Sequence, residues 1–175
     1  MKLNIRYYPD PILKKKCSEV KDITKDIKKL VFDMIETMDA DGGVGLAANQ
    51  VGEFHKILIL RPEIKTKEGE FALGEAEIYI NPILSNPSKE KEVMVEGCLS
   101  FPGIRIEIER PKAVQVEYID LMGKKKSEYI DGFKARVIMH ENDHLNGKVF
   151  VERAKKEDKK YIESQLKRFQ KKFKG

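Results

Sequence analysis

The chain has few cysteines for disulfide bonds and no long apolar segment for insertion into a membrane. It contains only 2 cysteines, too few for a disulfide framework, so we expect a reducing compartment, the cytoplasm. No apolar run approaches the ~20 residues that a membrane helix requires. The first residues also lack the apolar segment of a signal peptide. We therefore expect a soluble protein with no membrane partner.

The length of the chain limits the number of domains. A chain of 175 residues fits one domain with a hydrophobic core. We find no internal repeat and no low-complexity linker that would divide it. We predict a single domain, in which residues 1–150 form the body and residues 151–175 form a basic amphipathic helix that belongs to the same domain.

Histidine is scarce, and its placement is informative. The chain has 3 histidines, and two of them lie in His140-Glu141-Asn142-Asp143-His144. Side chains at positions i and i+4 of a helix share one face, so two imidazoles can bind one divalent cation there. The glutamate after the first histidine is then free to transfer protons. A chance match on a solvated helix is the alternative. However, residues 135–139 are mostly apolar, and a buried unpaired imidazole is costly. The motif predicts metal-assisted hydrolysis.

Two further segments offer groups that such a site needs. A catalytic metal site usually has three protein ligands and one open position. Cys98 lies in Glu-Gly-Cys-Leu-Ser, and a thiolate binds zinc or iron(II) well, although buried inert cysteines are common. Residues 43–50, Gly-Val-Gly-Leu-Ala-Ala-Asn-Gln, permit close backbone approach. They end in Gln50, whose amide can donate a hydrogen bond. Taken alone, this segment indicates a glycine-rich turn that leads into a buried strand.

Hydrophobic periodicity predicts an α+β fold with mostly antiparallel strands packed around a central helix. That helix spans residues 132–145 and carries the two histidines, and a C-terminal helix follows it. Thr24 is a candidate cap for an earlier helix. Residues 63–75 are charged and contain glycine, which indicates an exposed loop or hairpin. The remaining predicted helix and strands cover residues 24–38, 56–60, 77–80, 113–119 and 126–130.

The three motif segments occur in a fixed order along the chain, and this ordered set resembles the peptide deformylases. The resemblance extends from residue 8 to residue 147. It implies a peptide deformylase-like fold with residues 1–150 as a single catalytic metallohydrolase domain. It also implies hydrolytic removal of the N-formyl group from the N-terminal formyl-methionine of newly made proteins, with release of formate. Formyl-methionyl nascent peptides would then be the substrates. Residue patterns alone reach only a metal hydrolase.

The resemblance implies a role for each chemical group of the site. Glu141 would take a proton from the attacking water and pass it to the departing amine. The side-chain amide of Gln50 and the backbone N–H of Leu99 would donate hydrogen bonds to the tetrahedral oxyanion. The native metal would be iron(II), and zinc or nickel could replace it. The metal ligands would be Cys98, His140 and His144.

A substrate pocket is also implied by the resemblance. The extended substrate backbone would lie beside Val44 and Gly45 and pair like an added strand. Phe133 and Val137 share a helix face with the first histidine, although ordinary core packing would give the same pattern. Arg105 matches a substrate-contacting position, although a plain surface arginine would look the same. The positions that match the methionine pocket are Val44, Leu99, Phe133 and Val137. An ion pair is implied between Glu96 and Arg110.

The net charge of +5 comes largely from the C-terminal segment. A solvated helix face explains this charge, and weak docking to a ribosome through RNA is the functional alternative. We expect no DNA partner. Two competing functions remain open. One is a zinc peptidase whose third ligand is a downstream glutamate, and the other is a non-enzymatic RNA-binding module for which Glu141 would be dispensable. The downstream glutamates are Glu152, Glu157 and Glu163.

Overall fold

The computed structural model describes residues 1–173 and contains one large and two small antiparallel sheets. The large sheet has five strands in the order β1-β2-β5-β8-β9, and each small sheet is a pair, β3 with β4 and β6 with β7. The bounds are β1 (Gly45–Ala47), β2 (Ile57–Leu60), β3 (Glu63–Lys65), β4 (Phe71–Leu73), β5 (Glu77–Ser85), β6 (Lys91–Glu96), β7 (Ile106–Pro111), β8 (Ala113–Ile119) and β9 (Lys125–Asp131).

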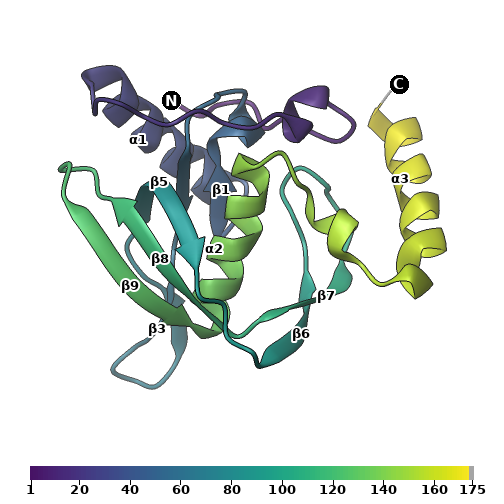
Figure 1. The fold of residues 1–175 in the computed structure, drawn as a ribbon. Helices are drawn as coiled ribbons and strands as arrows, with labels where there is room; N and C mark the ends of the chain where they lie inside the picture. The colour runs from purple at the N-terminus through teal and green to yellow at the C-terminus, as the bar shows by residue number, and fades with distance from the viewer. Residues whose placement is uncertain (174–175) are drawn as a thin grey trace.

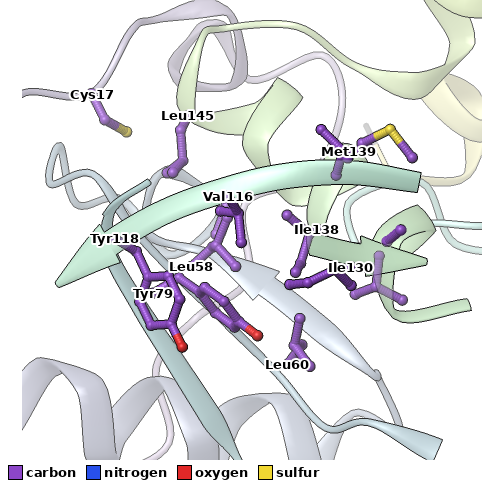
Figure 2. Packing of buried hydrophobic residues seen from close by; sticks show 14 residues of the cluster. Cys17, Leu58, Leu60, Tyr79, Val116, Tyr118, Ile130, Ile138, Met139 and Leu145 are labelled. Carbon is purple, nitrogen blue, oxygen red and sulfur yellow. The ribbon is translucent and has the colours of Figure 1, made fainter. Parts of the chain in front are cut away.

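Helices α1 (Lys25–Ala40) and α2 (Gly132–Leu145) cover opposite faces of the large sheet. Alternate side chains of β2 point to opposite faces. Leu58 and Leu60 therefore pack with Ile138 of α2 in a cluster that we call the main core cluster, as Figure 2 shows. Ile57 and Ile59 pack in a second cluster, which contains α1. This arrangement places α2 in the interior (Figure 1), and it confirms the predicted α+β fold around a central histidine-bearing helix.

A third apolar cluster lies under the β6–β7 pair. Ile106 and Ile108 of β7 pack there with Phe101, Phe150 and Ile162. Ile162 belongs to α3 (Lys159–Phe173), so this C-terminal helix packs on the fold through its apolar side. Within residues 1–173, no helix is both long enough and apolar enough to cross a bilayer. The short 3₁₀ helices span Pro11–Lys14, Ala48–Val51, Phe150–Arg153 and Lys156–Asp158.

Local sequence signals placed α1 and α2 well and the strands less well. The C-terminal helix predicted over residues 151–175 begins only at Lys159, because two short 3₁₀ helices occupy residues 150–153 and 156–158. The last two residues of that prediction, 174–175, lie outside the described residues. Helix α2 has the predicted bounds, and Thr24 caps α1 by accepting a hydrogen bond from the Ile27 N–H at 3.2 Å. The predicted strand over residues 77–80 was too short. It continues to Ser85 through a register shift between Ile80 and Ile83, an irregularity where proline is tolerated. Strands β1, β6 and β7 were not predicted.

Candidate metal centre

Helix α2 and the loop after β6 bring three potential metal ligands together. His140 and His144 lie one turn apart on α2, with ring centroids 5.2 Å apart. Cys98 follows the end of β6 by two residues, and its Sγ lies 3.3 Å from His144 Nε2. One ligand atom from each of these three residues lies within 4.8 Å of the other two. The structure therefore brings the three predicted ligands to one place.

These donors fit a divalent metal in both spacing and chemistry. A tetrahedral site with zinc bond lengths separates its sulfur and nitrogen ligands by about 3.5 Å, close to the observed distance between Cys98 and His144. One thiolate and two imidazoles suit zinc, iron(II) or nickel. The Nδ1 atom of His140 is engaged by a carboxylate oxygen of Glu96 at 2.8 Å. That contact leaves Nε2 of the same ring free to face a cation.

Glu96 belongs to a buried charge network behind the three potential ligands. Arg110 donates to both of its oxygens, at 2.6 and 3.0 Å, which confirms the predicted ion pair. Burial raises the pKa of Glu96, but the hydrogen bonds from His140 and Arg110 outweigh burial and lower it to about 2. Glu96 is therefore a carboxylate at neutral pH. Arg136 and Asp143 join this network. The only sequence signal for them was the presence of charged residues in an otherwise apolar helix segment.

Gln50 lies directly behind the cysteine. The backbone N–H of Ala47 donates to Gln50 Oε1 at 2.9 Å, and this contact orients the amide. Its Nε2 then donates to Ser100 Oγ at 3.1 Å and lies 3.5 Å from Cys98 Sγ. The 3₁₀ helix after β1 thus aims the amide donor at the proposed ligand sulfur.

Glu141 lies beside the ligands without belonging to the cluster. Its Oε1 is 3.6 Å from His140 Nε2, and its Oε2 is buried without a hydrogen-bond partner among the described residues. Burial raises the pKa of Glu141 to about 7. Burial lowers the pKa of His140, but the hydrogen bonds with Cys98 and Glu96 outweigh it and raise the pKa to about 10. A cation bound there must displace the proton of that imidazole.

A cavity of about 590 Å³ opens onto Cys98, His140 and Glu141. The side chains of Phe133 and Val137 line the cavity and also pack in the main core cluster. Gln50 and His144 lie deeper, at 1% and 0% exposure. All predicted pocket residues line the cavity, namely Val44, Gly45, Leu99, Arg105, Phe133 and Val137. Lining residues that were not predicted include Ile5, Tyr7 and Arg136.

Comparisons with known proteins agree on one family. A family model described as polypeptide deformylase matches residues 2–160. A peptide deformylase of Rhizobium meliloti is 42% identical over 144 residues, covering 82% of this chain and 80% of that protein. A peptide deformylase of Finegoldia magna is 41% identical over 149 residues, covering 85% and 87%.

Solved structures agree with the sequence comparisons. The crystal structure of a peptide deformylase from Ehrlichia chaffeensis in complex with actinonin is 37% identical. It matches with a TM-score of 0.88 and covers 99% of each chain. The peptide deformylase from Thermotoga maritima is also 37% identical, with a TM-score of 0.79 over 89% of this chain and 99% of that one. The chain belongs to the polypeptide deformylase family, whose members are metal-dependent enzymes.

Proposed function

We propose that this chain hydrolyses the N-formyl group of formyl-methionyl peptides, with Cys98, His140 and His144 binding one divalent cation. The observation that carries the proposal is the convergence of three ligand atoms within 4.8 Å beside a buried carboxylate, at the floor of a cavity. When bound, such a cation lowers the pKa of water and makes a nucleophile available near neutral pH. We propose iron(II) as the native ion, with zinc or nickel as replacements that suit the same donors.

The chain's own residues move the proton and bind the developing charge. Glu141 takes the proton of the attacking water and delivers it to the departing amine, a role that suits a carboxylate with a pKa near the working pH. The amide of Gln50 and the backbone N–H of Leu99 donate to the oxyanion that forms at the formyl carbon. Gln50 is supported in this role by the position of its Nε2, next to the proposed ligand sulfur.

Substrate selection follows from the cavity walls. Val44, Leu99, Phe133 and Val137 form an apolar lining suited to a methionine side chain. Strand β1 is an edge strand of the large sheet, so its outer edge can pair with an extended peptide near Gly45. This mode reads the main chain and tolerates many sequences after methionine. Arg105 is exposed and lines the cavity, where its cation can contact later substrate residues.

Formate release from formyl-Met-Ala-Ser by anaerobically purified protein tests the proposal, with metal analysis on the same sample. We expect formate and about one metal ion per chain. Cleavage of unformylated casein without formate release would instead favour a zinc peptidase. That alternative is disfavoured because, among the described residues, Cys98 completes the cluster around the two histidines, and the cluster contains none of the downstream glutamates Glu152, Glu157 and Glu163. Absence of both activities would overturn the proposed function.

Substitution of Gly45 by alanine is expected to lower kcat/KM. A Cβ at this position would lie 2.7 Å from Val137 Cγ1 and 3.1 Å from Glu141 Cγ, so the Val137 side chain must shift and the Glu141 side chain must give by a few tenths of an ångström. A displacement of about 1 Å in a catalytic group can cost about 10²-fold in rate, so we expect a smaller loss here. Steady-state formate kinetics would measure the loss, with unchanged metal content as the internal control. An unaltered kcat/KM would show that Glu141 has more freedom than the packing indicates.

We further propose that the chain works in the cytoplasm and docks weakly on ribosomes through α3. The support is a solvent-facing basic side on this helix, while Ile162 packs on the fold.

Exchange of Lys167 and Lys171 for glutamate should weaken sedimentation with ribosomes at low salt, because phosphate contacts depend on charge. The same exchange at the exposed Lys124 and Lys125 is the matched control. Equal sedimentation of both variants would indicate a merely solvated face.

A further inference from the structure

The hairpin that carries Cys98 shares no strand pairing with the large sheet. At its base, β7 runs through Lys112 into β8, and backbone hydrogen bonds tie Lys112 to Gly132 and Ala113 to Ser88. Strands β6 and β7 pair only with each other, whereas the large sheet contains β1, β2, β5, β8 and β9. Figure 1 shows this hairpin on the side of α2 away from β8 and β9. Cys98 lies at the far end of the hairpin from these base contacts, so strand pairing with the large sheet does not set its position relative to the two histidines of α2.

Apolar packing ties the hairpin mostly to other segments. Ile106 and Ile108 pack in the third cluster, with partners from the N-terminal segment and from the region after α2. The buried apolar residues of α2, such as Ile138, pack in the main core cluster instead. An aromatic contact links α2 to the third cluster, since the ring centroid of His140 lies 5.5 Å from that of Phe150. Leu99, beside Cys98, packs against the cluster that contains α1. Polar contacts supply further attachment between the hairpin and α2.

Arg136 makes three of these polar contacts. It lies on α2 four residues before His140, on the same face, and is 5% exposed. Its Nη1 donates to Glu96 Oε2 at 2.6 Å and to the Ile108 carbonyl at 2.9 Å, and its Nη2 donates to the Glu92 carbonyl at 2.6 Å. One side chain thus reaches both ends of β6 and the middle of β7. A planar guanidinium can bind three acceptors in this way, whereas a lysine ammonium lacks the fork.

We propose that Arg136 is a positioning residue that holds the cysteine hairpin against α2 and so sets the distance between Cys98 Sγ and the two imidazoles. The inference rests on the metal site proposed above. Glu96 couples the two halves, because the same carboxylate accepts from Arg136 and contacts His140 Nδ1. Arg136 keeps the sulfur and the ring nitrogens within reach of one cation.

The test measures metal release in Arg136→Lys, which keeps the positive charge beside Glu96 but loses the fork. Zinc-loaded protein is mixed with a chromogenic chelator well below the melting temperature, and the release rate is recorded. We expect release about 10- to 100-fold faster than in the parent chain, the usual effect of losing a residue that orients metal ligands. Lys134→Met is the matched control. Lys134 lies on the same helix but pairs with Glu77 of the large sheet, so this variant should release zinc at the parent rate.

The outcomes separate the inference from the proposed function. A parent chain that binds no stoichiometric zinc would overturn the metal site itself. A parent chain that retains zinc, together with an Arg136→Lys variant that only melts earlier and releases zinc at the parent rate, would overturn the positioning role. Reaction of Cys98 with a thiol reagent in the metal-free protein gives a second readout, and we expect it to be faster in Arg136→Lys. Arg136→Gln replaces the lysine variant if the latter does not fold.

Discussion

Exchange of Glu141 for glutamine is expected to lower kcat/KM for formyl-Met-Ala-Ser by about 10²–10⁴-fold, the usual contribution of a positioned acid–base group. Glutamine keeps the shape of the side chain but cannot accept the proton of water. Metal content should not change, because the three clustered ligands do not include Glu141. Formate release and metal analysis on one sample measure both quantities.

The control for this experiment is Glu152→Gln. Glu152 lies after α2 and pairs with Lys14, so its loss should leave both formate release and metal content intact. If Glu141→Gln lost its metal, Glu141 would be a ligand rather than a proton carrier. If Glu141→Gln kept full activity, the proposed role of Glu141 in proton transfer would be wrong.

Cys98→Ala should lose the metal. Only His140 and His144 would remain, and two imidazoles are too few for a tight site. We expect metal affinity to fall by more than about 10²-fold, beyond the effect of removing a residue that only orients a ligand. Formate release should fall in parallel. Anaerobic metal titration of the purified variant measures the loss.

Cys17→Ala is the matched control for that variant. Cys17 is buried in the main core cluster, as Figure 2 shows. Burial raises the pKa of its thiol to about 11, so the thiol is protonated near neutral pH and is a poor metal ligand. The control should keep its metal at the cost of some core packing. Full metal retention by Cys98→Ala would refute the assignment of Cys98 as a ligand.

The helices could be predicted because their signals are local. The apolar stripe and the cap at Thr24 specify α1, and the stop at Asn146-Gly147 specifies the end of α2. Strand β7 carries a local signal that our prediction did not use, because Glu107 and Glu109 alternate with apolar residues as in a half-buried strand. Only the tertiary fold shows that β7 pairs with β6 and not with the large sheet.

Three features could be read from the residues before any coordinates: the central helix, the two histidines on one of its faces and, through the order of three motifs, the family. Helix periodicity and motif order are properties of short stretches of chain and need no tertiary contact. Three contacts became visible only in the folded chain: Cys98 Sγ lies 3.3 Å from His144 Nε2, Glu96 contacts His140, and Arg136 joins the hairpin to the helix. These contacts link residues 40 or more positions apart. Their geometry depends on how separate elements pack, which no local pattern encodes.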